Sequence, residues 1–468
     1  MKTRNQYFLK RAALYYFLSL LLCTVIFIRR IMPWYSFVSG IGGMILFCLL
    51  SVQWEKEWKN KDDKKFERRV FWSALAIRLS WILLYNAFTN IVWESPWEQP
   101  IGTYMDSTGY FETAVWAKEM FNNGLWSVVF DFMLQTSISD AGYPLLLVLI
   151  NSISGDSILF TRIPNALFDA WTAVLVYRIA KRNFDVKTAQ IASIYTVLMP
   201  MLIFYTGVTM KETVMLMLIM WGLDLGDRII RDSRLDVLKI IGFTVIAFLL
   251  YLFRDVLTWV LLIAIFGAYA ISSPRIKQAS QRTIILVLVV SVVMIVAGGT
   301  ILRQYEAVES QLAMTEDNFI HRSNTNALVS GLTKGMFAPL MFTIPFPTMV
   351  DIPGQYVQAI QNGGFFIKNI LSFFCVFGII DLLRKGKWRN SSFLLEFLIG
   401  YLIVLGMSSF AHSGRFHHPV ICVEIIFAAY GMQAISTIRQ AKMFNLFFIL
   451  EVIFVIGWNW FKLAGRGL

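Results

Sequence analysis

Apolar runs of bilayer-spanning length recur along almost the whole of this 468-residue sequence. A helix needs about 20 mostly apolar residues to cross a bilayer, because water is absent there and the backbone must satisfy its own hydrogen bonds. Charged residues make up 15% of the chain, against about a quarter in soluble domains. These features predict an all-α, polytopic membrane protein, with residues 1–468 forming a single integral membrane domain rather than a soluble domain on an anchor.

Thirteen spans are expected, and the first lacks a small-residue cleavage site, which indicates a retained helix rather than a signal peptide. Their ranges are 11–28, 34–53, 70–91, 157–180, 187–206, 212–231, 237–253, 256–271, 283–302, 366–383, 393–410, 419–437 and 444–461. Cysteines occur only in apolar runs, without metal-ligand or disulfide spacing, and are expected to be buried, inert thiols; they are Cys23, Cys48, Cys375 and Cys422.

The basic residues orient the spans, because loops on the cytoplasmic side of a membrane are enriched in Lys and Arg. With a cytoplasmic N-terminus, loop 55–69, which holds seven Lys and Arg, falls inside. The other basic loops also fall inside: 178–187, 228–239, 274–282 and 384–389. Only Arg29 and Arg30 disagree. Topology therefore accounts for the net charge of +12 without a nucleic-acid partner.

Two long segments are then expected on the outer face, and they divide the chain. The first outer loop is 92–156, followed by a helical core (157–302), a second outer loop (303–365) and C-terminal spans (366–468). The first loop contains YFETAVWAKEMFNNG, which predicts an amphipathic helix, and AGYPLLLVLINSISGD, which is too short to span and is expected to lie on or dip into the outer leaflet. Prolines in the second loop argue against a regular helix there and favour an ordered cap or a lipid-contacting loop.

Several charged side chains are expected at the outer membrane surface. Asp106 lies just past the third span, where it is either an idle solvated acid or a reactive group. Lys211 and Glu212 lie at the outer mouth of the sixth span, although a Glu in the first turn is also an ordinary helix start. Arg162 opens the fourth span, and Asp169 lies about two turns deeper, where pairing with a polar group of the bundle is expected.

A late hairpin, SSFAHSGRFHHPVICVE, concentrates the remaining candidates on the same face. It contains His412, Arg415, His417 and His418, and the chain has only four histidines. Arginine binds phosphate in a forked geometry, although a snorkelling Arg at a helix end would give the same pattern. The histidine spacing matches no strong zinc pattern.

Together these groups suit a substrate with a lipid tail in the bilayer and a phosphate at its surface. A carboxylate serves as general base for an acceptor hydroxyl, and Arg and Lys stabilise a leaving phosphate. Two alternatives remain open from the residues alone. One is a polysaccharide polymerase or ligase acting on undecaprenyl-diphosphate glycans; the other is a lipid or solute transporter.

The order of these elements resembles the GT-C glycosyltransferases, in particular the group of protein O-mannosyltransferases and aminoarabinose transferases. The resemblance covers 95–230 and 408–437, and it implies that Asp106 is the catalytic acid of the first outer loop. The other matching positions are Tyr143-Pro144, Arg162, the cluster Tyr177, Arg178, Lys181 and Arg182, the second acid Glu212, and Arg415-Phe416 with Pro419.

The resemblance implies inverting sugar transfer from a polyprenyl-phosphate donor to a lipid, glycan or protein acceptor of the cell envelope. Asp106 would deprotonate the acceptor, Arg415 and Lys211 would bind the phosphate, and Glu212 would orient the acceptor or hold Lys211. The remaining substrate-binding candidates are Arg162, Tyr104, Tyr110, His412, His417 and His418. No cofactor is required, although Asp106 with Glu212 or a histidine would be able to hold a divalent cation. The absence of a sequon from the predicted outer loops favours a bacterial plasma membrane, with the site on its extracytoplasmic side.

Overall fold

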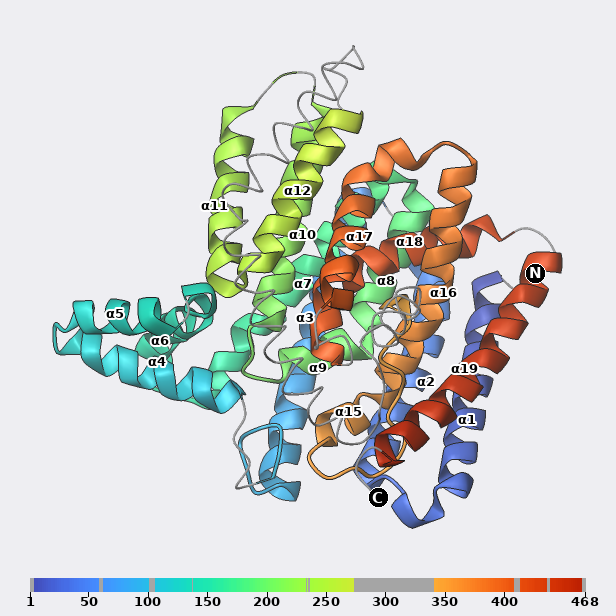
Figure 1. Cartoon of the computed structure of the whole chain (residues 1–468), viewed down its shortest axis with the longest axis horizontal. Coiled ribbons are helices and arrows are strands. Elements are labelled where there is room, and N and C mark those ends of the chain that lie inside the picture. The colour runs from blue at the N-terminus through green and yellow to red at the C-terminus, as the bar shows by residue number, and fades with distance from the viewer. Residues whose placement is uncertain are drawn as a thin grey trace, which may run out of the picture.

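The structure is a computed structural model of the chain. It describes residues 4–58, 62–100, 106–136, 138–232, 234, 236–272, 341–407, 413–435 and 438–464. Every regular element within these ranges is a helix, which confirms the predicted all-α class (Figure 1).

The first half of the chain contains α1 (Arg4–Ile26), α2 (Trp34–Trp58), α3 (Asp63–Val92), α4 (Asp106–Asn122), α5 (Trp126–Thr136), η2 (Ile138–Asp140), α6 (Gly142–Ser154), α7 (Ile158–Asn183), α8 (Val186–Leu198), α9 (Pro200–Thr206) and α10 (Glu212–Arg231). The second half contains α11 (Val237–Phe253), α12 (Asp255–Ser272), α15 (Tyr356–Ile360), α16 (Asn362–Arg384), α17 (Ser392–Met407), η6 (Gly414–Val420), α18 (Ile421–Ala434) and α19 (Ile438–Ala464).

The helices make this a multi-pass membrane protein, but the count of thirteen spans is not confirmed. Within the described ranges, seven helices are long and apolar enough to cross a membrane, or up to nine if each of two bent pairs is one span. The predicted span 283–302 lies outside the described residues. The predicted spans 212–231 and 419–437 correspond to α10 and α18, most of whose residues are buried in the protein, so much of their apolar character serves packing against other helices.

The expected continuous span 187–206 is wrong in detail, because the helix breaks before Pro200. The segments α8 and α9 meet at an angle of 49°. Proline lacks a backbone N–H, and its ring clashes with the preceding turn of a helix. The break directs α9 and the turn after it toward the start of α10, where two candidate residues lie.

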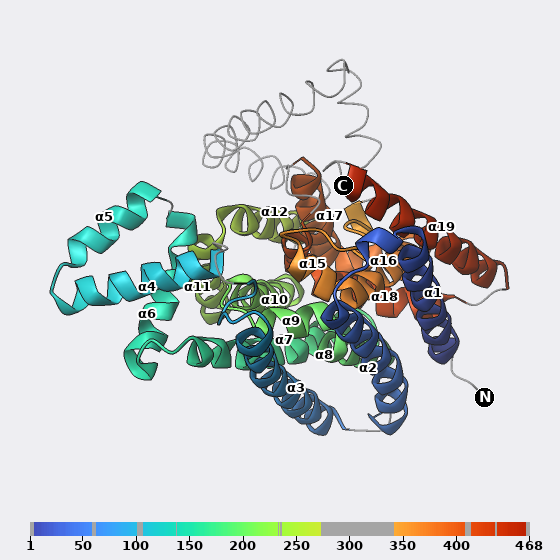
Figure 2. The ribbon, with the colours of Figure 1, turned by 90° about the horizontal axis from the view of Figure 1, so that it is seen from below.

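A unit of three helices projects from one side of the bundle. Figures 1 and 2 both show α4, α5 and α6 beside the packed helices rather than among them, with α4 lying against α6. The chain turns by 116° between α6 and α7. The two helices predicted within segment 92–156 are therefore present as α4 and α6.

The centre of the bundle is formed by α16 and α18, which are in very close contact. A Cβ at Gly378 would lie 2.6 Å from the carbonyl oxygen of Phe427, and one at Gly431 would lie 2.0 Å from that of Phe374. Small residues allow this approach, as in other membrane helix pairs. Of the predicted second outer loop (303–365), residues 341–365 are described: 341–355, which contain the prolines, form no regular α-helix, whereas α15 and the start of α16 follow. There Lys368 donates to the carbonyls of Phe342 and Ile344 at 2.7 Å.

Asp169 is paired inside the bundle, as predicted. Its carboxylate forms an ion pair with Arg78 of α3, and both side chains are buried. Arg78 also donates to the carbonyl of Thr196 at 3.0 Å and to that of Val197. The pair therefore joins α3, α7 and α8.

Replacing Asp169 by Ala is expected to lower the free energy of unfolding by about 3–5 kcal/mol, because Arg78 would keep its charge in a buried place without a counter-ion. The loss should appear as a lower midpoint of thermal unfolding of the detergent-solubilised protein. Asp131→Ala, which removes an exposed carboxylate of α5, is the control. Equal midpoints for the two variants would contradict a structural role for the pair.

Candidate active site

Three segments far apart in the sequence supply the candidate site. Asp106 is the first residue of α4, Glu212 is the first residue of α10, and Arg415 lies in η6. Arg415 forms an ion pair with Asp106 through its Nη1 atom, and the two side chains are 31% and 47% exposed. The structure therefore brings together the first outer loop and the late hairpin, which are 309 residues apart.

Arg415 carries its charge under the influence of two acids. Burial opposes the charge, but the carboxylates of Glu212 and Asp106 outweigh that effect and raise the pKa of the guanidinium. Arg415 also lies with its Cζ atom 4.9 Å from the ring centre of Phe416, whose carbonyl accepts a hydrogen bond of 2.7 Å from Tyr401. These contacts hold a cation against Asp106, where the charge of Glu212 also acts on it.

Glu212 occupies the N-terminal end of α10, where the helix dipole favours a negative charge. Its side chain is buried, and its Oε2 atom has no hydrogen-bond partner among the residues that the structure describes. Its charge also acts on the phenols of Tyr110, Tyr143 and Tyr205. Glu212 is thus an acid inside the site, surrounded by aromatic side chains.

Lys211 has partners within the protein. Its Nζ atom forms an ion pair with Asp140 of η2, donates to the carbonyl of Phe253 at 3.0 Å, and lies 5.8 Å from the ring centre of Tyr110. Burial lowers the pKa of Lys211, while Asp140 acts in the opposite direction. Lys211 therefore connects the start of α10 with the projecting unit and with the end of α11.

Arg162, near the start of α7, is fully buried. Its Nη2 atom donates to the carbonyl of Pro96 at 2.5 Å, and its Nη1 atom donates to Asn86 at 3.3 Å. Its Nε atom reaches Thr209 at 3.5 Å. Arg162 thereby fixes the start of the first outer loop against α3 and the turn before α10.

The histidines are deeper than expected for surface ligands of a phosphate. His417 and His418 are both buried, and His412 lies outside the described residues. The ring of His418 packs edge-on against that of Tyr205, with 4.7 Å between the ring centres. Burial lowers the pKa of His418 to about 3, so its imidazole is neutral. Within the described ranges no group of three or more His, Cys, Asp or Glu is arranged to hold a metal ion.

Two further residues belong to this region: Glu98, which no sequence pattern indicated, and Arg254, which the sequence places with Asp255 in a tight turn between two predicted spans, in either a structural or a functional role. Glu98, in the loop between α3 and α4, is 1% exposed, and both its carboxylate oxygens lack a partner at hydrogen-bond geometry in the described part of the chain. Arg254, at the end of α11, lies with its Cζ atom 4.4 Å from the ring centre of Phe416. The sequence WESPWEQP places Glu94 and Glu98 in the same kind of surroundings, so it gave no signal that singles out Glu98.

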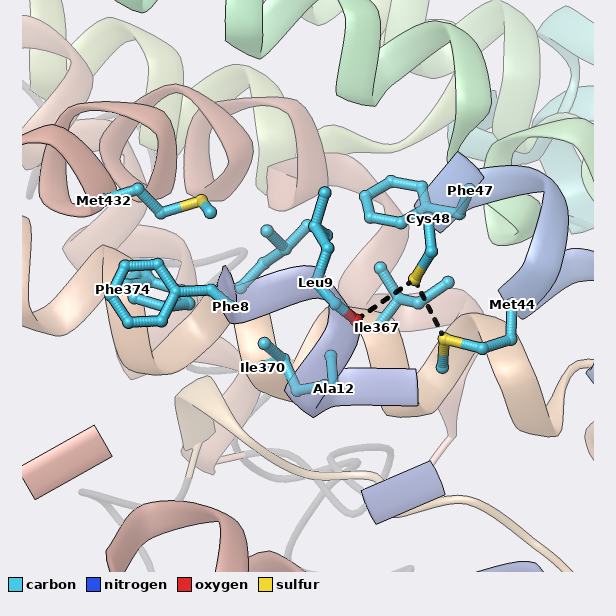
Figure 3. A pocket seen from close by; sticks show the side chains of 11 residues that line it. Phe8, Leu9, Ala12, Met44, Phe47, Cys48, Ile367, Ile370, Phe374 and Met432 are labelled. Atoms are coloured by element: carbon cyan, nitrogen blue, oxygen red, sulfur yellow. Dashed lines mark hydrogen bonds between the residues drawn. The ribbon is translucent and has the colours of Figure 1, made fainter. Parts of the chain in front are cut away.

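The apolar crevice between α1, α2, α16 and α18 is separate from these groups. Figure 3 shows only hydrophobic and sulfur-containing side chains around it, with Cys48 donating to the carbonyl of Leu9 at 3.6 Å. The cysteines are free thiols, and Cys23, Cys375 and Cys422 are buried. A crevice without an acid, a base or a hydroxyl offers packing space but no catalytic group.

Residues 142–299 match the family model of the dolichyl-phosphate-mannose-protein mannosyltransferases. The matched region contains Arg162, Lys211 and Glu212, whereas Asp106 and Arg415 lie outside it. No curated protein and no solved structure matches the chain. The match supports a glycosyltransferase of the GT-C type, in agreement with the resemblance of the residue order.

Proposed function

We propose that this chain, a multi-pass membrane glycosyltransferase of the GT-C type, moves a sugar from a polyprenyl-phosphate donor to a hydroxyl acceptor with inversion at the anomeric carbon. The observation that carries the proposal is the ion pair of Asp106 with Arg415 beside the buried Glu212. It offers a base for the acceptor and a cation for the leaving phosphate at one place.

In this reaction the carboxylate of Asp106 takes the proton of the acceptor hydroxyl. The acceptor oxygen forms a bond with the anomeric carbon, on the side opposite the phosphate. The bond from that carbon to the phosphate oxygen breaks, and the polyprenyl phosphate leaves with the electron pair. Asp106 is 47% exposed, so an acceptor reaches it without rearrangement of the core.

Arg415 has a second task in this proposal, because the same guanidinium faces Asp106 before the donor binds. A phosphate is a strong partner for the forked donors of Arg. When the donor phosphate takes over part of Arg415, the carboxylate of Asp106 loses a counter-charge and becomes a stronger base. Donor binding thus prepares the base for the acceptor.

The neighbouring residues have supporting tasks. Glu212 keeps Arg415 cationic and in place, and Lys211 adds positive charge near the phosphate while paired with Asp140. Tyr110 belongs to α4, the helix that begins at Asp106, and its ring lies near Lys211, where it offers an aromatic surface to the sugar. His417 and His418 support η6 behind Arg415, and Arg162 holds the loop that precedes α4.

We place the site on the extracytoplasmic side of a bacterial plasma membrane. The support is the distribution of Lys and Arg among the loops, together with the ion pairs at the opposite ends of the helices. There Arg178 pairs with Glu67 at 2.6 Å, and Arg182 pairs with Asp224 at 2.6 Å. The acceptor class, lipid, glycan or protein, is for the assay to identify.

Reconstituted protein tests the proposal directly. Proteoliposomes would receive undecaprenyl-phosphate mannose, glucose or galactose with a membrane fraction as acceptor source, and sugar transfer would be measured. Undecaprenyl-diphosphate glycan forms a separate arm, because polymerisation of that substrate would point to a polysaccharide polymerase instead. Transfer from at least one monophosphate donor supports the proposal, and turnover of the diphosphate glycan alone overturns it.

Removing divalent cations is expected to leave this activity within about twofold, because Arg415 and Lys211 supply positive charge to the leaving phosphate. The measurement compares transfer rates after dialysis against EDTA with rates after readdition of Mg²⁺ or Mn²⁺. A loss that either ion restores would instead indicate a cation held by Asp106 with Glu212.

A further inference from the structure

A group of buried polar atoms lies under the start of α4, beside the proposed catalytic groups. We name it the Glu98 cluster; its members are Tyr85, Glu98, Ser107, Tyr143 and Glu212. Each has at least one buried side-chain oxygen without a partner at hydrogen-bond geometry in the described ranges. The Glu98 charge acts on Tyr85 and Tyr143, and the Glu212 charge acts on Tyr143 and Glu98, so these atoms share one region.

Glu98 is a member of this cluster that does not form an ion pair with the neighbouring cation, Arg162. The N–H groups of Arg162 are directed to Asn86, Pro96 and Thr209, and no ion pair joins Arg162 to Glu98. Burial raises the pKa of Glu98, while Ser107 and Arg162 act in the opposite direction. Ser107 comes close to the carboxylate, yet neither group reaches the geometry of a hydrogen bond.

Buried polar atoms in folded proteins nearly always have a partner, and a set without partners indicates a ligand or ordered water. Here two carboxylates provide acceptors, and three hydroxyls provide donors and acceptors. Positive charge is already supplied by Arg162 and Arg415, so the cluster has no need of a cationic ligand. A neutral molecule with several hydroxyl groups fits this pattern of donors and acceptors.

We propose that the Glu98 cluster binds hydroxyl groups of the sugar that is transferred, with Glu98 as a specificity-determining acceptor. The inference rests on the proposed function, because it supplies the sugar subsite of that reaction. Two chain connections support the location. Ser107 follows Asp106 directly in α4, and Glu212 belongs to the cluster while also facing Arg415. A sugar held there presents its anomeric carbon toward the base and the phosphate-binding cation.

The first test measures discrimination between donors by native protein, Glu98→Gln and the control Glu94→Gln, which changes an exposed acid of the same loop. The probes are the best undecaprenyl-phosphate sugar and its monodeoxy analogues. Native protein and Glu94→Gln should reject at least one analogue by about 10²-fold or more in kcat/KM, since a site built to bind a hydroxyl rejects a substrate lacking it. In Glu98→Gln that ratio should fall to within about threefold. An equal loss for donor and analogues would overturn the inference.

Thermal unfolding gives the second test. Loss of a structural acid lowers the unfolding midpoint, whereas loss of a ligand-binding acid does not. Removal of an unpartnered buried charge is expected to leave the unfolding midpoint unchanged or raise it in Glu98→Gln and Glu98→Leu. A large fall in both, comparable to that of Asp169→Ala, would make Glu98 a structural counter-charge of Arg162 and overturn the inference.

The same measurement separates the inference from the proposed function. If native protein transfers no sugar but a donor raises its midpoint, and does so in Glu94→Gln but not in Glu98→Gln, the subsite stands and the proposed reaction falls. If transfer occurs with an unchanged discrimination ratio, the reaction stands and the subsite falls. If no donor is transferred and none stabilises the native protein, both fall.

Discussion

Asp106→Asn is expected to lower kcat for sugar transfer by about 10²–10⁴-fold, which is the usual contribution of a general base. The amide keeps the size of the side chain and its place at the start of α4 but cannot accept the acceptor proton. The fold should persist, since an ion pair that is partly exposed contributes only about 0–1 kcal/mol. The measurement is the transfer rate at saturating donor, with the unfolding midpoint recorded for the same sample.

Glu119→Gln is the matched control, because Glu119 lies on the same helix and is exposed. Its kcat should equal that of the native protein. Full turnover in Asp106→Asn would remove the proposed base and with it the mechanism. A loss of turnover that accompanies a large fall in the unfolding midpoint would assign Asp106 to folding instead.

The positions of the helices follow from the sequence, but their exposure to lipid does not. Apolar content identified the segments that became α10 and α18, since hydrophobic runs of this kind form helices in either environment. Whether such a helix faces lipid or protein depends on its neighbours. The carboxylates of Asp224 and Asp227 are buried in α10, where both pair with Arg182. The sequence does not show that these partners are adjacent, because they come together only when the helices pack. Hydropathy alone therefore does not establish the count of thirteen spans.

The same distinction applies to the candidate site. Residue chemistry and topology predicted that Asp106, Glu212 and Arg415 belong to one site, and the structure pairs Asp106 with Arg415 under the influence of Glu212. Which of these side chains contact each other depends on how distant parts of the chain turn toward one another, as at the break before Pro200. No local sequence pattern predicts such contacts. Lys211 was expected near the phosphate, but its partnership with Asp140 requires the fold of the projecting unit.

Glu98 illustrates the remaining gap. In the sequence it is one of two acids in a short loop, and Glu94 has the same neighbours in kind. The structure buries Glu98 and leaves Glu94 exposed, because Arg162 draws the carbonyl of Pro96 inward. Burial of a loop residue depends on such long-range contacts. The sequence around Glu94 and Glu98 therefore does not predict which of the two acids is buried.

Arg415→Lys should lower kcat/KM for the donor by about 10²–10³-fold, the range measured when one donor to a developing anion is removed. Lysine keeps the charge but lacks the planar fork that addresses a carboxylate and a phosphate together. The unfolding midpoint should change little, because the pair with Asp106 is partly exposed. Arg384→Lys, an exposed arginine at the far end of α16, is the control.

The donor KM distinguishes this role from simple charge. If Asp106 and the donor phosphate compete for Arg415, Asp106→Asn frees the guanidinium and should lower the donor KM while kcat falls. Arg415→Lys should raise the donor KM, because the phosphate loses its forked partner. Opposite movements of KM in the two variants would therefore identify one cation shared between base and phosphate. A rise of KM in both would mean that Asp106 helps to bind the donor, and the competition would be wrong.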